Sequence, residues 1–276
     1  ELSRRGHSVS IYEPSLVGGF APLPLKLAMM PWRVLDMRRV IGKLDRNHFD
    51  IIHIHWASYG LLGLVSQIPF IVHCHGSDIR DRYHHPLFRP ILTTIFRRAS
   101  AVLGITPDLM HPIKQIRPDA LFFPGPINTD RFAPTKTNQL DSSHPWTILL
   151  FTRLDPVKGP ETAIQGIARF AYRHLDVRVQ LLDWGLLKSE YKQRYGSRFE
   201  FIKLVPPEEV QHMVWSADVV VGQFALGILS LCELQAMSCA KPVICSFRYN
   251  NAYPSSPPLC CATTAEQIDE QLENLY

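Results

Sequence analysis

Short apolar runs rich in Val, Ile and Phe alternate with longer amphipathic stretches along the chain, and this alternation limits its fold more than any other feature. Strands separated by helices are typical of parallel sheets, which carry helices on both faces. The short runs predict strands and the longer stretches predict helices. We therefore expect an α/β protein built from doubly wound, Rossmann-like parallel sheets.

The pattern runs through two successive halves. In the first half, strands are predicted at 8–12, 51–55, 70–75, 101–105 and 120–123, and helices at 33–44, 59–66, 86–98 and 107–114. In the second half, strands are predicted at 146–151, 177–182, 199–202, 219–221 and 242–245, and helices at 161–172, 187–195, 207–216, 230–239 and 264–275. A polar stretch with Pro and Asn separates the halves. We expect domains at 1–134 and 146–276, joined by a linker at 135–145.

The composition is that of an ordinary globular protein, with 276 residues, 46% hydrophobic and 20% charged. This length is enough for two hydrophobic cores. No apolar run reaches the roughly eighteen residues of a membrane-spanning helix, and the first residues have no apolar core of a secretory signal. The six cysteines lie in apolar segments without metal-ligand spacing. We expect free, buried thiols in a reducing cytoplasm.

Positive charge is concentrated in the first half. Residues 1–134 contain sixteen Lys and Arg against ten Asp and Glu, whereas residues 135–276 contain thirteen against fifteen. The segment 80–98 mixes several arginines with large apolar residues. One interpretation is a basic amphipathic helix that contacts anionic lipid headgroups on the inner face of the cell membrane. The other is a surface helix that packs its apolar side on the sheet.

The segment Phe151-Thr-Arg-Leu-Asp-Pro-Val-Lys-Gly159 follows the first predicted strand of the second half. Arg153 offers a planar fork of donors and Lys158 a compact ammonium group. Gly159 and the proline after it open the next helix, and a helix N-terminus attracts anions. Two cations beside a helix N-terminus predict a diphosphate site. The alternative is a loop with two solvated cations.

The same segment resembles the R-x(4)-K-G element of the family-four retaining glycosyltransferases. Other segments resemble family motifs in the same order along the chain: His75-Gly-Ser-Asp78, Arg98-Ala-Ser-Ala-Val-Leu-Gly-Ile105, Pro124-Gly-Pro-Ile-Asn128 with Arg131-Phe-Ala-Pro134, Ser216-Ala-Asp218 and Gln235-Ala-Met-Ser-Cys-Ala-Lys-Pro-Val243. The resemblance covers nearly the whole chain.

This resemblance implies the GT-B fold, in which two Rossmann-like domains face each other across a cleft. It implies transfer, with retention, of a sugar from a UDP-, GDP- or ADP-sugar to a hydroxyl of a glycan or a lipid-linked acceptor. Arg153 and Lys158 would stabilise the departing diphosphate, so no covalent nucleophile, metal or other cofactor is expected. We therefore expect a role in polysaccharide or glycolipid biosynthesis. We expect no nucleic-acid partner.

Further donor-binding residues follow from the resemblance: Gly159, Gly227, Ile228, Leu229, Glu233 and Gln235. Family members have two glutamates seven positions apart where this chain has Gly227 and Gln235. Gln235 retains an acceptor oxygen for the donor ribose but lacks the charge. Glu233 has two interpretations, because Ser230-Leu-Cys-Glu233 also has the pattern of a helix-capping box.

Histidines alternate near the ends of two predicted strands, as His53-Ile-His55 and His73-Cys-His75. Alternation places each pair on one face of its strand. No carboxylate or thiolate completes a metal shell at fixed spacing, so we expect no metal and a neutral core histidine at 53 or 73. The resemblance places His75 over the transferring sugar.

By the same resemblance, His55, Trp56 and Asp78 are expected on the acceptor side. The first β-α unit of the family and its closing helices have no counterpart in the sequence, so a fragment is expected. Two alternatives stay open. One is another GT-B enzyme, such as a sugar phosphorylase or an epimerase. The other is a non-catalytic subunit that binds a nucleotide sugar.

Overall fold

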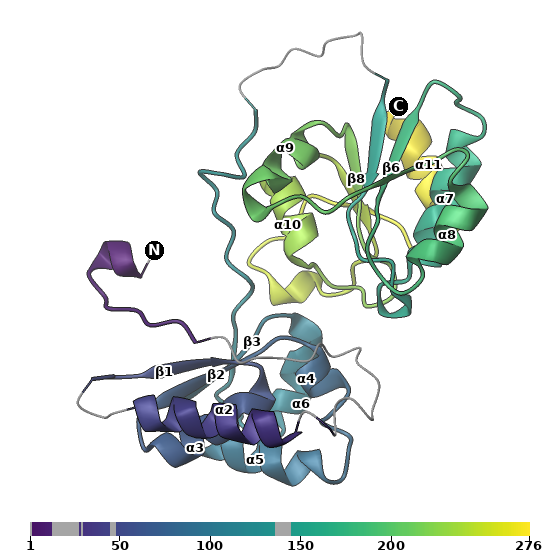
Figure 1. Cartoon of the computed structure of the whole chain (residues 1–276). Coiled ribbons are helices and arrows are strands. Elements are labelled where there is room, and N and C mark those ends of the chain that lie inside the picture. The colour runs from purple at the N-terminus through teal and green to yellow at the C-terminus, as the bar shows by residue number, and fades with distance from the viewer. Residues whose placement is uncertain (1, 13–27, 29, 45–47, 136–144) are drawn as a thin grey trace. The chain divides into compact units, whose positions relative to one another are not determined.

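The chain divides into two compact α/β units, each with its own parallel sheet. The computed structural model describes residues 2–12, 28, 30–44, 48–135 and 145–276 (Figure 1). One unit comprises Glu1–Ile105 and Leu109–Phe123, and the other comprises Thr106–Asp108 and Pro124–Tyr276. Of the linker predicted at 135–145, residues 136–144 lie outside the described residues.

The first unit contains a four-stranded sheet in the order β1-β2-β3-β4, with every neighbouring pair parallel. Its strands are β1 (Ile52–His55), β2 (Phe70–Cys74), β3 (Ala101–Gly104) and β4 (Leu121–Phe122). Its α-helices are α2 (Met30–Lys43), α3 (Gly60–Ser66), α4 (Ser77–Arg80), α5 (Phe88–Arg98) and α6 (Met110–Lys114). Short 3-10 helices are η1 (Ser3–Arg5) and η2 (Ala57–Tyr59), and η3 (Pro107–Leu109) contains residues assigned to both units.

Alternate side chains of the first sheet form its core. Ile54 of β1 and Val72 of β2 are buried with Leu92, Ile95 and Phe96 of α5. Because successive strand residues point to opposite faces, the histidines of β1 and β2 lie on the other face. In the parallel register His55 is paired with His73. This register places the two alternating histidine pairs side by side.

The second unit contains a six-stranded parallel sheet in the order β10-β9-β8-β5-β6-β7. Its strands are β5 (Thr147–Leu150), β6 (Arg178–Leu182), β7 (Glu200–Ile202), β8 (Val219–Val221), β9 (Val243–Cys245) and β10 (Cys260–Cys261). Its α-helices are α7 (Pro160–Ala171), α8 (Lys188–Tyr195), α9 (Val210–Trp215), α10 (Leu231–Ser238) and α11 (Ala265–Leu275). Its 3-10 helices are η4 (Pro156–Lys158), η5 (Pro207–Glu209) and η6 (Asn250–Ala252).

Helices cover both faces of this second sheet (Figure 1). Ile148 and Leu150 of β5 belong to a core shared with α7, α8 and α11. Leu149, between them, belongs to a second core shared with α9 and α10. The chain before the sheet contributes to that second core through Phe132, and the indole of Trp215 donates a hydrogen bond to the carbonyl of Ala133, 2.8 Å. The unit is therefore doubly wound, as the sequence predicted.

Apart from the 3-10 helices, the predicted elements agree in order and type with the described strands and α-helices except in three places. The predicted strand at 8–12 is wrong, because among the described residues no strand pairs with it and Ile11 is 84% exposed. An apolar run becomes a strand only when a neighbour completes its hydrogen bonds. The two-residue strand β10 and the one-turn helix α4 were not predicted. Both are too short for a periodic pattern to identify.

Helices α7 and α11 pack closely at a glycine. A Cβ at Gly166 would lie 2.6 Å from Cβ of Ile268 and 2.8 Å from the carbonyl oxygen of Ala265. Ion pairs flank this contact, and Arg173 reaches Asp269 at 2.7 Å. The glycine thus permits the two helix backbones to approach.

We expect Gly166→Ala to destabilise the protein by about 1–3 kcal/mol, because the added methyl overpacks the helix contact. In an unconstrained helix the same change would stabilise by roughly 0.5–1 kcal/mol. Gly42→Ala in α2 is the matched control, since nothing lies within 4 Å of its Cβ position. Urea unfolding followed by circular dichroism gives both values. A Gly166→Ala protein as stable as wild type would contradict the packing argument.

Candidate functional site

The loops that follow β5, β6 and β8 meet at one edge of the second sheet. These three strands are neighbours and parallel, so their carboxyl ends lie together. Within the sheet, β6 and β7 follow on one side of β5, whereas β8, β9 and β10 follow on the other side of β5. The strand order therefore reverses between β5 and β8. In open parallel sheets, ligands bind beyond the strand ends at such a reversal.

Arg153 lies in the loop after β5, where two groups orient its guanidinium. Its Nε forms an ion pair with Oδ2 of Asp155, whose side chain is 3% exposed. The guanidinium carbon lies 5.4 Å from the ring centroid of Trp184, in the loop after β6. The other carboxylate oxygen of Asp155 accepts a hydrogen bond from the Leu186 amide at 2.7 Å. Arg153 is therefore fixed in orientation while 28% of its side chain stays exposed.

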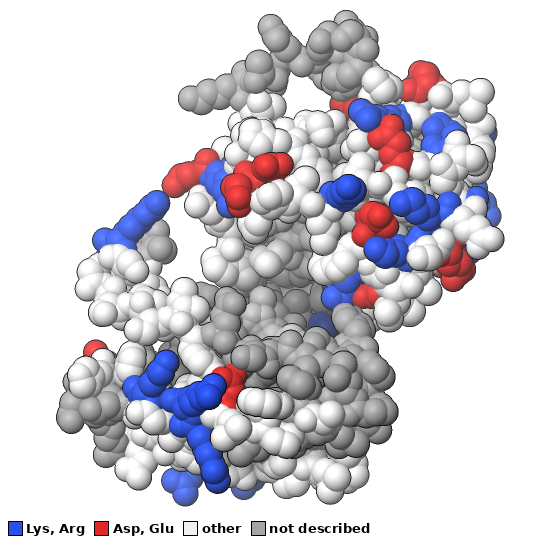
Figure 2. All heavy atoms as spheres, viewed as in Figure 1, with Lys and Arg blue, Asp and Glu red and all other residues white. Residues whose placement is uncertain are grey.

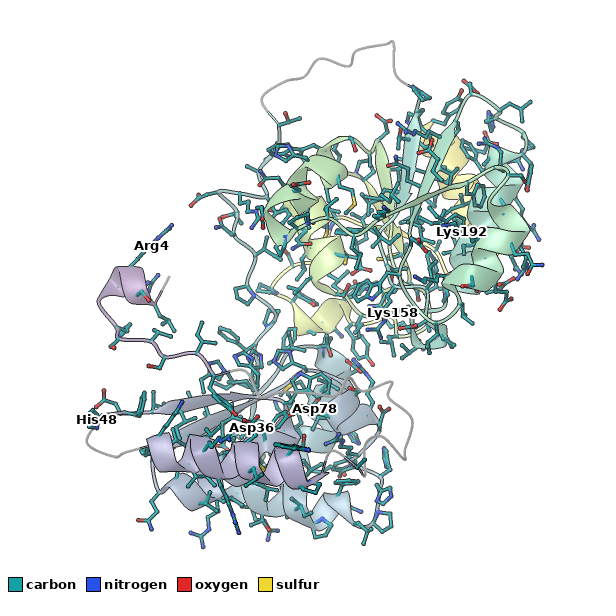
Figure 3. The ribbon with its side chains drawn as sticks, viewed as in Figure 1. Arg4, Asp36, His48, Asp78, Lys158 and Lys192 are labelled. Carbon is teal, nitrogen blue, oxygen red and sulfur yellow. The ribbon has the colours of Figure 1, made fainter. Side chains whose placement is uncertain are left out.

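Lys158 ends the 3-10 helix η4 and connects the loop after β5 to the loop after β8 (Figure 3). Its carbonyl oxygen accepts a hydrogen bond from the amide of Phe224 at 2.9 Å. Gly159 follows with φ +66°, and a Cβ there would lie 2.8 Å from the amide nitrogen of Ala225. A side chain at 159 would be strained in its backbone and would also separate the loops.

Helix α7 begins directly after Gly159, with Pro160 in its first turn. Proline fits this position because the first amides of a helix have no partner within it. The partial positive charge of the helix N-terminus thus lies next in sequence to Lys158. Together with Arg153, this arrangement is suited to an anion.

The loop after β8 contains Gly227, Ile228 and Leu229. Gly227 has φ +64°, and its carbonyl accepts a hydrogen bond from the Arg248 amide at 3.0 Å. A Cβ at Gly227 would lie 2.4 Å from Nε of Arg248. Ile228 and Leu229 are buried. An exposed arginine therefore flanks the position at which the resemblance expects a carboxylate.

Glu233 forms the predicted capping box of α10. One of its carboxylate oxygens accepts from the Ser230 amide at 2.8 Å and from the Ser230 hydroxyl, and the other accepts from the Gln223 amide at 3.0 Å. Its side chain is completely buried. The capping interpretation is confirmed, and this carboxylate ties the start of α10 to the loop after β8.

Gln235 lies half-buried on α10, three positions after Cys232. Residues three apart share a helix face. Burial and then the charge of Glu233 raise the pKa of the Cys232 thiol to about 12, while the charge of Lys158 acts in the opposite direction. Lys158 is therefore within electrostatic range of the helix face to which Gln235 belongs.

Asp78 connects the two loops that follow β1 and β2 in the first unit (Figure 3). Its carboxylate accepts hydrogen bonds from the amides of Ala57 at 2.8 Å, His75 at 3.0 Å and Gly76 at 2.7 Å. It is completely buried. This predicted acceptor-side residue thus fixes the backbone of the loops, and its neighbours present the exposed side chains.

His55, Trp56 and His75 lie together on these loops. Nδ1 of His55 and Nε2 of His75 form a hydrogen bond of 2.8 Å. Burial and then the charge of His55 lower the pKa of His75. Trp56 is 43% exposed and has φ +77°, a backbone conformation that is rare for a residue with a side chain.

His53 and His73 complete a group of stacked imidazoles. Burial, with smaller contributions from neighbouring histidines, lowers the pKa of each to about 4. Both rings are therefore neutral at pH 7. His73 is buried as expected, whereas His53 is exposed and does not belong to the core.

Sequence reasoning missed three residues of the second unit. Asp155 lies within the motif that identified Arg153, but its role depends on the ion pair. Trp184 and Arg248 come from other loops, and only the fold brings them to this edge. A polar or aromatic residue directly after a predicted strand is the signal that could have found them.

The sequence profile described as Glycosyltransferase Family 4 matches residues 1–131. No protein of curated function matches the chain by sequence. Across the described residues, no helix is both long and apolar enough to cross a membrane.

Several solved structures share the fold. HepE of Anabaena in complex with UDP and glucose superposes with a TM-score of 0.67 at 15% identity, over 99% of this chain and 77% of HepE. Sucrose-phosphate synthase of Thermosynechococcus elongatus gives 0.68 at 16% identity, over 93% and 71%. A UDP-forming trehalose-phosphate synthase of Burkholderia xenovorans gives 0.64 at 13% identity, over 88% and 70%.

These comparisons bear out the resemblance that the motifs indicated. The two parallel-sheet α/β units and the structural neighbours identify the fold as GT-B. The chain has the GT-B fold, and its first 131 residues match the sequence profile of Glycosyltransferase Family 4.

Proposed function

We propose that this protein is a retaining glycosyltransferase that moves a hexosyl group from a nucleotide sugar to an acceptor hydroxyl. The observation that carries the proposal is the pair Arg153 and Lys158 beside the N-terminus of α7, at the strand reversal between β5 and β8. Three positive groups at one sheet edge form a site for a diphosphate. A UDP-, GDP- or ADP-sugar is the donor class, and HepE, which binds UDP-glucose, supports it.

Charge stabilisation is the catalytic step that these groups can supply. Negative charge develops on the diphosphate as the glycosidic bond breaks, and oriented cations stabilise that charge more in the transition state than in the ground state. Asp155 and Trp184 orient Arg153 before the donor binds. This arrangement needs neither a covalent nucleophile nor a divalent metal.

We propose that side chains of the first unit contact the transferring sugar and the acceptor. His75 would hydrogen-bond a hydroxyl of the transferring sugar, and Asp78 fixes its backbone for that contact. His55 and the exposed ring of Trp56 would line the acceptor side. A glycan or a lipid-linked acceptor fits an aromatic ring beside imidazole donors.

Helix α5 supports a peripheral contact with an anionic membrane. Its buried side packs in the core, as the surface-helix interpretation expects. Leu87, Phe88 and Ile91 are nevertheless exposed, and the helix ends with Arg97 and Arg98. On the face shown in Figure 2, blue side chains group on the first unit where Figure 1 shows α2, whereas blue and red mix on the second unit. Exposed apolar residues at the start of a helix and arginines at its end suit a lipid interface.

A non-catalytic subunit that binds a nucleotide sugar is the second candidate. It is favoured by Gly227, where a hydrogen-bonded glycine and Arg248 take the place of a carboxylate. Slow hydrolysis of the donor by the protein alone would argue against it.

We expect Arg153→Ala and Lys158→Ala each to lower kcat by about a hundredfold or more, with smaller effects on donor binding. The reason is that both cations act most strongly on the leaving diphosphate. Arg178→Ala is the matched control, because Arg178 begins β6 at the opposite edge of the sheet. Steady-state transfer from labelled donor measures both parameters. Wild-type kcat in either variant would exclude the diphosphate assignment.

We expect transfer to persist after chelation, because cations of the protein take the place of a divalent ion. The assay compares protein treated with EDTA against the same protein with added Mg²⁺ or Mn²⁺. Equal rates are the expected result. Loss of activity in EDTA with recovery in Mg²⁺ or Mn²⁺ would indicate a different transferase architecture.

We expect Gln235→Glu to tighten binding of the nucleoside diphosphate by about 1 kcal/mol, because a charged acceptor makes stronger hydrogen bonds to the ribose. Repulsion from the phosphates is reduced by Arg153 and Lys158. Gln193→Glu, on the exposed side of α8, controls for the added charge. Calorimetry with the preferred nucleotide compares the three proteins. Unchanged or weaker affinity would mean that Gln235 does not face the ribose.

A further inference from the structure

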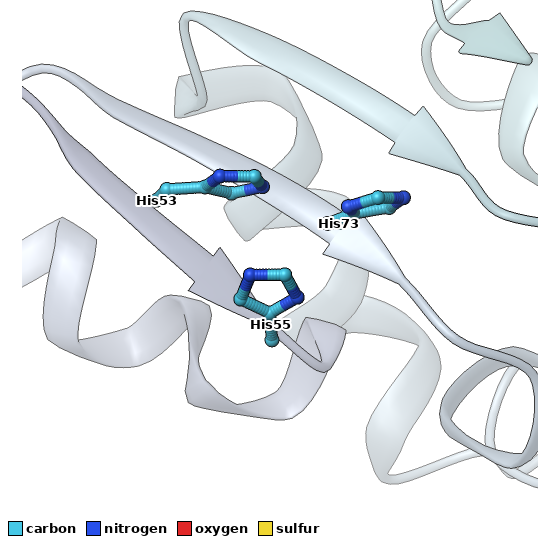
Figure 4. A group of neighbouring side chains, drawn as sticks. All are labelled: His53, His55 and His73. Atoms are coloured by element: carbon cyan, nitrogen blue, oxygen red, sulfur yellow. The ribbon is translucent and has the colours of Figure 1, made fainter. Parts of the chain in front are cut away.

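Three imidazoles on neighbouring strands converge on one face of the first sheet (Figure 4). His53 and His55 come from β1, and His73 comes from β2, directly opposite His55 in the parallel register. One ring nitrogen from each lies within 4.8 Å of the other two. The rings of His53 and His55 are exposed to solvent, so the group is accessible.

The second nitrogen of two of these rings is already engaged. His55 uses Nδ1 for its hydrogen bond with Nε2 of His75, 2.8 Å, which leaves its Nε2 for another ligand. His73 directs Nε2 to the carbonyl oxygen of Phe123 at 3.4 Å, and its buried Nδ1 has no hydrogen-bond partner. Metal-binding histidines typically donate their other N–H to such a partner, which fixes the ring and its tautomer.

We infer that His53, His55 and His73 form a binding site for a borderline divalent metal ion, of which Zn²⁺ is the representative. Imidazole ligands suit Zn²⁺, Ni²⁺ and Cu²⁺ rather than Mg²⁺ or Ca²⁺, which prefer oxygen. Three histidines with a fourth position open to water are a common zinc-binding set. His75 supports the site through His55 and is not itself a ligand.

Closing the site requires only side-chain movement. Zn–N distances of about 2.0–2.1 Å place the nitrogens of a tetrahedral site roughly 3.3 Å apart. The observed nitrogens therefore need to approach by about 1.5 Å at most. His53 can rotate because it is exposed, while the hydrogen bond to His75 orients His55 and the sheet holds His73. The strands themselves already have the required register.

The site belongs to the first unit and shares His55 with the proposed acceptor side, so its test uses a readout that does not depend on sugar transfer. The readout is metal binding by the whole untagged chain, stripped with a chelator and exchanged into chelator-free buffer. Calorimetric titration with ZnCl₂ should give one equivalent per chain. His53→Asn, His55→Asn and His73→Asn should each weaken Zn²⁺ binding by about tenfold or more, because each removes one ligand.

His84→Asn is the matched control, since His84 is an exposed histidine of the same unit outside the group. It should bind Zn²⁺ as wild type does. His75→Asn should weaken binding by about tenfold and keep the stoichiometry of one. Circular dichroism of the metal-free variants checks folding. If the His73 variant does not fold, the Zn²⁺ affinities of the His53 and His55 variants decide the result, because both side chains are exposed.

Two results would overturn the inference. One is the absence of a one-equivalent binding event in the wild-type chain. The other is a triple variant of His53, His55 and His73 that binds Zn²⁺ as tightly as wild type, which would assign the ion to the cysteines or other histidines. Failure of the Arg153 and Lys158 predictions would leave both readouts unchanged, so the two proposals fail independently.

Discussion

The hydrogen bond from the amide of Phe224 to the carbonyl of Lys158 joins the loops that follow β8 and β5, where the strand order of the second sheet reverses. It holds the loop after β5 against the loop after β8, and Gly159 permits the approach through its left-handed backbone and missing side chain. Because the same glycine begins α7, one contact sets both the position of Lys158 and the direction of the helix N-terminus. The positions of Lys158 and of the helix N-terminus thus depend on backbone contacts, and their side chains do not determine them.

Buried carboxylates perform comparable tasks in both units. Asp78 accepts hydrogen bonds from three amides in two loops of the first unit. Glu233 accepts hydrogen bonds from the amides of Gln223 and Ser230 in the second unit. Charge-assisted bonds of this kind are stronger than neutral ones, and a buried acceptor that lost its donors would be costly. Asp155 differs, because it also orients a cation. Asp78 holds the backbone of His75, Glu233 holds the backbone at Ser230, and Asp155 holds the guanidinium of Arg153. Each of these roles is made by contacts within the protein.

The sequence predicted the order and type of nearly all the elements, since alternating strands and helices leave a strong periodic pattern. It also predicted the cap at Glu233, which is a local interaction. It could not identify the partner of Arg248 at Gly227 or the stacking of Trp184 on Arg153, because these contacts join loops distant in sequence. For the histidines, alternation gave the face of each strand but not the register between strands. The expected strand at 8–12 was wrong because periodicity contains no information about whether a neighbour is present.

Trp56 occupies a backbone conformation that a glycine would adopt at no cost. A bulky residue held at positive φ costs the fold about 1–3 kcal/mol, and surrounding contacts must supply it. The amide of Trp56 donates a hydrogen bond to the carbonyl of His73, and the amide of Ala57 donates one to the carboxylate of Asp78. These two bonds hold the backbone that carries the indole. Random substitution followed by selection for thermostability alone would therefore drive this position towards glycine. Under the proposed acceptor-side role of Trp56, stability and activity impose opposite demands on this position.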